Sequence, residues 1–224
     1  MSHLEIELKN LKSEMLEMFA LVKLQLEKSK AALVNLDKDL AREVLVNEKR
    51  VNGFELKLDR DCENIIALFN PVAIDLRLVL ACMKINSNLE RIGDIAEGIS
   101  QFVLNIKLEP EKKLLETTRL IEMYDTAILI TYEVMEAFNN EDTKRARSVF
   151  KMDEILDEIN LNANQAVADF IRENPDRINQ SLYLLSAIRK LERVGDQCKN
   201  ISEEIIFYIE AKVLKHKSRE QKQA

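Results

Sequence analysis

Residues that interrupt helices are scarce in this sequence of 224 residues, which contains 4 glycines, 3 prolines and no tryptophan. A protein built from many short strands needs turns rich in glycine and proline, so this scarcity argues against an all-β fold. Hydrophobic residues make up 46% and charged residues 32% of the chain, a normal balance for a folded soluble protein. The composition therefore favours helices joined by short connections.

Long apolar runs, excess positive charge and an even cysteine count are also missing. No run of 18 apolar residues exists, and the N-terminus carries charges where a signal peptide is apolar, so we expect a cytoplasmic protein. The net charge of -6 and the pI of about 5.3 provide no basic field for nucleic acid, which is not an expected partner. Cys62, Cys82 and Cys198 lie in apolar helical stripes, so we expect them to be buried thiols rather than disulfides.

Apolar residues recur at steps of three and four, the period of an amphipathic helix, in six segments. These segments cover residues 4–26, 40–69, 71–106, 114–135, 149–170 and 178–208. Pro71, Pro110 and Pro175 lie at inferred helix starts, where a missing N–H is tolerated. Asn70 and Asn174 precede two of them and are expected to be N-caps. Each helix would contain about 28 to 35 residues and extend for about 40 to 50 Å.

The sequence contains an internal duplication. Leu-Glu-Arg-Ile-Gly-Asp at Leu89–Asp94 recurs as Leu-Glu-Arg-Val-Gly-Asp at Leu191–Asp196, 102 positions later. A weaker correspondence, 105 positions apart, relates Glu48–Asn52 to Asp153–Asp157. We therefore predict an all-α fold of two tandem antiparallel three-helix bundles, with six long helices. The predicted units are residues 1–107 and 108–213, and residues 214–224 form a basic tail that is expected to be disordered.

Carboxylates spaced four residues apart lie inside the duplicated segments. Because residues i and i+4 share one face of a helix, Glu90 lies beside Asp94 and Glu192 beside Asp196. If the second and third helices of each unit are antiparallel neighbours, their acidic pairs meet at a similar height. Such pairs also arise by chance and are often solvated, so a purely structural helical scaffold is the alternative. The candidate metal ligands are Glu48, Glu90, Asp94, Asp153, Asp157, Glu192 and Asp196.

The expected cation follows from the ligands that the chain lacks. The two histidines, His3 and His216, lie near the chain ends, and an all-oxygen site suits iron, manganese, magnesium or calcium. The repeated glycines, Gly93 and Gly195, indicate either close helix packing or room for a ligand. No nucleophile–base pair or Gly-rich phosphate loop is evident, so we predict no enzymatic activity. The motif also repeats an arginine, Arg91 and Arg193. We expect these arginines either to form salt bridges or to bind an anionic group of a partner.

These motifs carry a resemblance to a known family. The run Pro71–Arg77 (Pro-Val-Ala-Ile-Asp-Leu-Arg), followed by Leu89–Asp94 and its copy Leu191–Asp196, resembles the signature of the PhoU family over nearly the whole chain. The resemblance implies a cytoplasmic accessory protein of phosphate transport that acts with a phosphate ABC transporter ATPase and a membrane sensor histidine kinase. It also implies repression of phosphate-starvation genes when phosphate is plentiful, and metal binding at the acidic motifs. We further expect a homodimer, because the long helices have extra apolar positions.

The chain departs from the family pattern in two places. Asn52 stands where a second carboxylate follows Glu48, so we expect weaker metal binding at the first site. The second unit has Asn-Pro-Asp-Arg-Ile at Asn174–Ile178 in place of the Pro-Val-Ala-x-Asp-Leu-Arg run, so the two halves are expected to differ in role. An accessory protein of another phosphate carrier, without a metal function, is the alternative.

Overall fold

The computed structural model describes residues 2–214, and these residues form helices and no strands. The predicted all-α class is therefore confirmed. The long helices are connected by turns of a few residues. In chain order the elements are α1 (His3–Asn35), α2 (Lys38–Phe69), α3 (Ala73–Asn105), α4 (Lys112–Thr117), α5 (Leu120–Asn140), α6 (Thr143–Glu173), the 3₁₀ helix η1 (Pro175–Arg177) and α7 (Ile178–Glu210).

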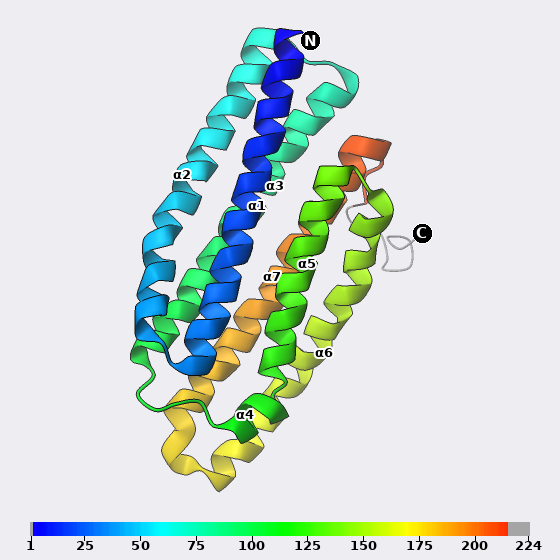
Figure 1. Ribbon diagram of the computed structural model, residues 1–224. Coiled ribbons are helices and arrows are strands. Elements are labelled where there is room, and N and C mark those ends of the chain that lie inside the picture. The colour runs from blue at the N-terminus through cyan, green and yellow to red at the C-terminus, as the bar shows by residue number, and fades with distance from the viewer. Residues whose placement is uncertain (1, 215–224) are drawn as a thin grey trace.

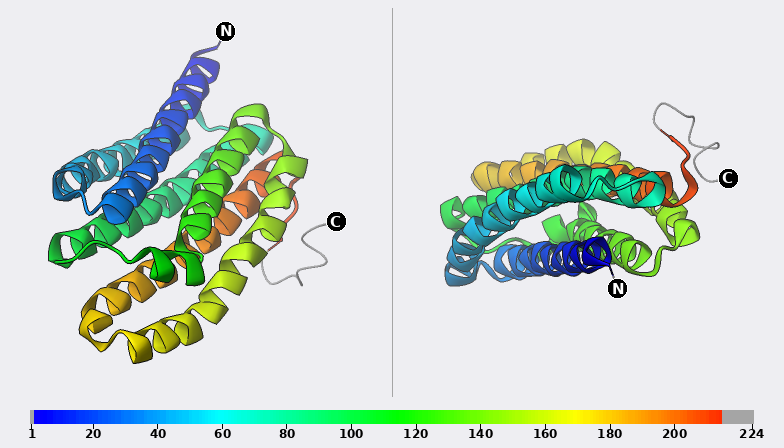
Figure 2. Two further views of the ribbon diagram at one scale, coloured as in Figure 1. Left: turned by 60° about the horizontal axis from the view of Figure 1, so that its bottom comes forward. Right: turned by 90° about the horizontal axis from the view of Figure 1, so that it is seen from above.

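Two three-helix units lie side by side, as the duplication predicts. Helices α1, α2 and α3 pack together as the first unit, and α5, α6 and α7 as the second. The units meet mainly where α3 packs against α7, with a second contact between α1 and α5. Figure 2 shows the resulting two layers: α2, α3, α7 and α6 form one layer, and α1 and α5 cover it from one side.

Equivalent turns connect the first two long helices of each unit. Leu36 ends α1 in the left-handed region with a φ of 51°, and Glu141 ends α5 in the same way with a φ of 55°. The next residue caps the following helix: the carboxylate of Asp37 accepts from two backbone N–H groups of α2, and Asp142 does so for α6. An aspartate at the N-cap satisfies helix N–H groups that have no partner within the helix. The duplication therefore extends to these turns, each with a left-handed C-cap residue followed by an aspartate N-cap.

The fourth predicted helix is divided into α4 and α5. Arg119 takes a left-handed conformation with a φ of 53°. The hydroxyl groups of Thr117 and Thr118 donate to the carbonyl oxygens of Lys113 and Leu114, at 2.8 and 2.6 Å. Such bonds from threonine compete with the helix ladder, which explains why regular helix stops here.

The N-cap prediction for Asn70 is wrong. Asn70 is the C-cap of α2, with a φ of 46°, and α3 begins at Ala73, after Pro71. Asparagine is favoured both at N-caps and at left-handed C-caps, so its presence beside a proline did not discriminate between them. Asn174 does precede η1, but its side chain donates back to the Phe170 carbonyl oxygen at 3.1 Å and makes no cap bond to the next helix.

The apolar stripes predicted from the sequence form the core. All three cysteines are buried and free, as expected. Within residues 2–214, no helix is both long and apolar enough to cross a membrane. The predicted basic tail, apart from Leu214, lies outside the described residues, as does His216.

Candidate functional site

The two candidate sites lie where the second and third long helices of each unit pack against each other, α2 on α3 and α6 on α7. A glycine on the third helix makes room for a carboxylate from the second. A Cβ at position 93 would lie 3.0 Å from Glu48 Oε2, and a Cβ at position 195 would overlap Asp153 Oδ1. The repeated glycines therefore allow close packing of a buried acidic side chain against the third helix.

Glu48 is the buried centre of the first acidic cluster. Glu48 is 4% exposed, and neither of its carboxylate oxygens has a hydrogen-bond partner within residues 2–214. Burial raises the pKa of Glu48 to about 8, and neighbouring carboxyl groups add to the effect. Burial opposes the charged form, and so does negative charge nearby. Near neutral pH, this buried acid holds its proton in the absence of a cation. The neighbouring carboxyl groups, in order of effect, are Asp94, Glu97, Glu90 and Glu55.

The other predicted residues of the first site surround Glu48. Burial, followed by the charge of Asp94 four residues later on the same helix face, raises the pKa of Glu90. Burial also raises the pKa of Glu55, with contributions from the charge of Asp59 and then of Asp94. The structure therefore brings together the three predicted ligands Glu48, Glu90 and Asp94. Glu55 and Glu97, which the sequence reasoning missed, stand seven residues after Glu48 and Glu90, a spacing that keeps them on the same helix faces.

The second acidic cluster contains a lysine at its centre. Lys199 Nζ lies 2.6 Å from Asp153 Oδ2 and 2.7 Å from Asp196 Oδ1. Burial opposes the charge of Lys199, but the hydrogen bonds to these two carboxylates outweigh it and raise the lysine pKa. Burial raises the pKa of Asp153 as well, and the contact with Lys199 only partly offsets this.

The remaining predicted residues of the second site also lie nearby. Burial raises the pKa of Glu192, and the charges of Asp196, Asp157 and Asp153 raise it further. All four predicted side chains of this unit therefore belong to one cluster. Lys199 was missed, although it follows Asp196 by three residues and so stands on the same helix face.

The clusters differ in how well they suit a metal ion. Across residues 2–214, no three or more His, Cys, Asp or Glu side chains are arranged as a ready-made metal site. The first cluster nevertheless fits a hard cation, because its donors are carboxylate oxygens and the buried oxygens of Glu48 lack partners. In the second cluster an ammonium group already neutralises Asp153 and Asp196.

Arg91 and Arg193 face solvent between the two clusters. Both are exposed, and in the described part of the chain neither lies within ion-pair distance of a carboxylate, although the charge of Arg91 partly offsets the raised pKa of Glu90. With Lys190 they line one surface hollow of about 280 Å³ between α3 and α7. Asp94 and Glu97 of the first cluster line the same hollow, so three cationic side chains adjoin that cluster.

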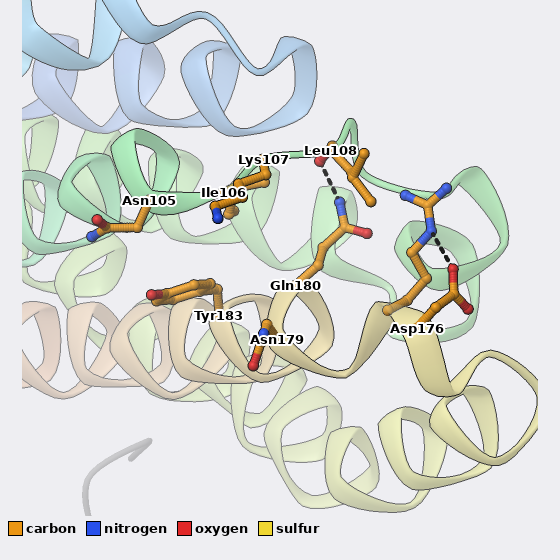
Figure 3. A pocket seen from close by; sticks show the side chains of 9 residues that line it. Asn105, Ile106, Lys107, Leu108, Asp176, Asn179, Gln180 and Tyr183 are labelled. Carbon is orange, nitrogen blue, oxygen red and sulfur yellow. Dashed lines mark hydrogen bonds and ion pairs between the residues drawn. The ribbon is translucent and has the colours of Figure 1, made fainter.

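A second hollow, of about 370 Å³, lies near one end of the bundle between the α3–α4 connection and the start of α7 (Figure 3). Gln180, which is 6% exposed, donates to the Leu108 carbonyl oxygen at 2.6 Å. This hydrogen bond ties the connection to α7. The other lining residues include Lys107, Asp176 and Tyr183, and none of the predicted site residues is among them.

Comparison with known proteins identifies the family. The profile described as the PhoU domain matches residues 15–103 and 120–205, so each match contains one acidic cluster. The chain belongs to the PhoU family. It is 32% identical to a "Phosphate-specific transport system accessory protein PhoU homolog" of Burkholderia sp, over 98% of this chain and 94% of the relative. It is 31% identical to the Escherichia coli K12 protein "Phosphate-specific transport system accessory protein PhoU", over 94% of this chain and 86% of the relative.

Solved structures of PhoU proteins have the same fold. The crystal structure of PhoU from Pseudomonas aeruginosa superposes with a TM-score of 0.87 at 29% identity, covering 93% of this chain and 99% of that one. The phosphate transport system regulatory protein PhoU from Streptococcus pneumoniae superposes with a TM-score of 0.82 at 25% identity, covering 95% and 99%. The whole duplicated architecture is therefore a PhoU architecture.

Proposed function

We propose that this protein is a cytoplasmic regulator of phosphate uptake that represses phosphate-starvation genes when phosphate is plentiful. Its relatives are named accessory proteins of the phosphate-specific transport system, and the matches extend over 98% and 94% of this chain. That full-length match carries the proposal, because it includes both duplicated units. The proposed partners are a phosphate ABC transporter ATPase and a membrane sensor histidine kinase, between which the protein acts as an adaptor rather than as an enzyme.

Metal binding at an acidic cluster is the second part of the proposal. The buried, unpartnered carboxylate of Glu48, beside Glu90 and Asp94, supports a site for a hard cation such as iron, manganese, magnesium or calcium. A bound cation would neutralise carboxyl groups that otherwise repel one another. It would thereby hold α2 and α3 in one arrangement that a partner recognises.

Arg91 and Arg193 are the proposed partner contacts. Their exposed guanidinium groups and Lys190 line one hollow between the units, which suits an acidic segment of a partner protein. We also propose that the protein forms a homodimer. Light scattering on the purified protein tests the dimer directly, and a monomeric mass at micromolar concentration contradicts it.

A reporter experiment in cells tests the regulatory role. Deletion of the gene is expected to switch on a phosphate-starvation promoter at high phosphate, and the wild-type gene on a plasmid should restore repression. The test variant combines Arg91→Glu on α3 with Arg193→Glu on α7, which reverses the charge of both arginines in the hollow. The control variant is Lys57→Glu, at an exposed position on α2 outside the hollow. Unchanged expression in the deletion strain contradicts the proposal. Repression by the double variant equal to wild type contradicts the role of the two arginines.

A further inference from the structure

The two acidic clusters differ at one equivalent position. The 102-residue offset that relates Glu90 to Glu192 also relates Glu97 to Lys199. The second cluster therefore contains a basic side chain where the first contains another acid. Both positions follow their aspartate, Asp94 or Asp196, by three residues and lie on the same helix face.

In the second cluster, the lysine supplies a cation from the chain itself. Its Nζ lies 2.6 Å from Asp153 and 2.7 Å from Asp196, so it bridges α6 and the aspartate of α7. The side chain of Asp153 is 3% exposed, and that of Lys199 is 24% exposed. A buried carboxylate of this kind requires a positive partner, and the ammonium provides one for Asp153 Oδ2, whereas Asp153 Oδ1 has no hydrogen-bond partner within residues 2–214.

In the first cluster, the corresponding buried carboxylate has no such partner. Glu48 is 4% exposed, and both of its oxygens lack a hydrogen bond within residues 2–214. The four charged groups that act on it are all carboxyl groups, including Asp94 and Glu97. Arg91, Lys190 and Arg193 line the outer hollow beside Asp94 and Glu97. None of the three is among the charged groups that act on Glu48, so the buried carboxyl group itself has no basic partner.

We propose that Lys199 replaces a metal ion in the second cluster, so that a divalent cation binds to the first cluster alone, through Glu48, Glu90, Asp94 and Glu97. This inference rests on the metal-binding part of the proposed function and reverses the order of affinity expected from Asn52. A cation entering the second cluster would have to break two short ion pairs and leave Lys199 half-buried beside it. A cation entering the first cluster would break none with a basic side chain.

The number of metal sites is measured by titrating metal-free full-length protein with Mn²⁺. Calorimetry and the electron paramagnetic resonance signal of free Mn²⁺ monitor the binding. We expect one ion per chain for wild type, no detectable binding for Glu48→Gln, and one ion for Asp153→Asn. Exchanging the equivalent side chains tests the role of the lysine. Glu97→Lys should abolish binding, and the double variant Glu97→Lys with Lys199→Glu should regain one ion at the second cluster. Circular dichroism confirms that each variant is folded.

Several results would overturn the inference. Two ions per chain in wild type, with one lost in Asp153→Asn, would show that Lys199 does not exclude metal. Unchanged binding in a folded Glu97→Lys variant would show that an ammonium at this position does not compete. Absence of Mn²⁺ binding in wild type overturns the inference together with the metal-binding part of the proposed function. The regulatory part is measured separately, with the promoter reporter, so its failure is distinguishable from each of these outcomes.

Discussion

Replacement of Gly195 by alanine tests the close packing of the buried carboxylate on the glycine. Glycine inside a helix is less favourable than alanine by about 1 kcal/mol, so Gly→Ala stabilises a helix where space exists. At position 195 space is missing, because the added methyl group would overlap Asp153 Oδ1 and lie 2.8 Å from Leu156 Cδ1. Displacement of Asp153 would also disturb its ion pair with Lys199.

Gly53 provides the matched control within the same protein. It also lies inside a long helix, α2, but a Cβ there would meet no atom within 4 Å. Gly53→Ala should therefore stabilise the protein by about 0.5–1 kcal/mol. Gly195→Ala makes the same gain in helix propensity and adds an overpacking penalty of about 1–3 kcal/mol. The difference in free energy of unfolding between the two variants then equals the overpacking term.

Urea denaturation without added metal, followed by circular dichroism, measures this difference. Gly93→Ala should fall between the two, since its methyl group would lie 3.0 Å from Glu48 Oε2 and Val51 Cγ1. Gly98→Ala should behave like the control, because the nearest atom is the flexible end of Lys190. If Gly195→Ala stabilises the protein as much as Gly53→Ala, with equal denaturant slopes, the glycine does not serve to admit the carboxylate.

Three further predictions concern charged groups. Because burial raises the pKa of Glu48 from 4.5 to about 8, the folded chain binds more protons than the unfolded chain between these pH values. The free energy of unfolding should thus fall more between pH 4.5 and 8 in metal-free wild type than in Glu48→Gln, by at most about 5 kcal/mol; equal pH profiles would contradict this. Lys199→Met should cost about 3 kcal/mol by leaving a buried carboxylate unpaired, against less than about 1 kcal/mol for Lys57→Met at an exposed pair. In urea denaturation, Asp37→Ala and Asp142→Ala should each cost about 1 kcal/mol, and an unchanged midpoint would argue against their capping role.

Much of the architecture was predictable because it depends on local periodicity. Apolar steps of three and four residues define which face of each helix is buried, and short connections make successive helices antiparallel. The repeated Leu-Glu-Arg-x-Gly-Asp then fixes the duplication and the location of both acidic clusters, since i and i+4 carboxylates share a helix face. These properties belong to single helices or to neighbours in the chain.

Local ambiguity accounts for the errors in helix boundaries. Asn70 precedes a proline, which favours an N-cap, yet asparagine is equally suited to the left-handed C-cap that it occupies. The break at Arg119 lacks a glycine that would have indicated a left-handed residue. Two threonine hydroxyls interrupt the helix ladder there, and threonine also occurs within regular helices.

The sequence by itself determined the helical class, the duplication and the seven acidic residues predicted for the two clusters, but not Glu55, Glu97 or Lys199. The tertiary structure alone decided that α3 packs on α7, that Glu48 is buried without a partner, and that Lys199 bridges two helices. Whether an acidic side chain is solvated, protonated or paired depends on its distance from groups on other helices and on its depth below the surface. Helical periodicity specifies a direction for each side chain, but it contains neither of these quantities.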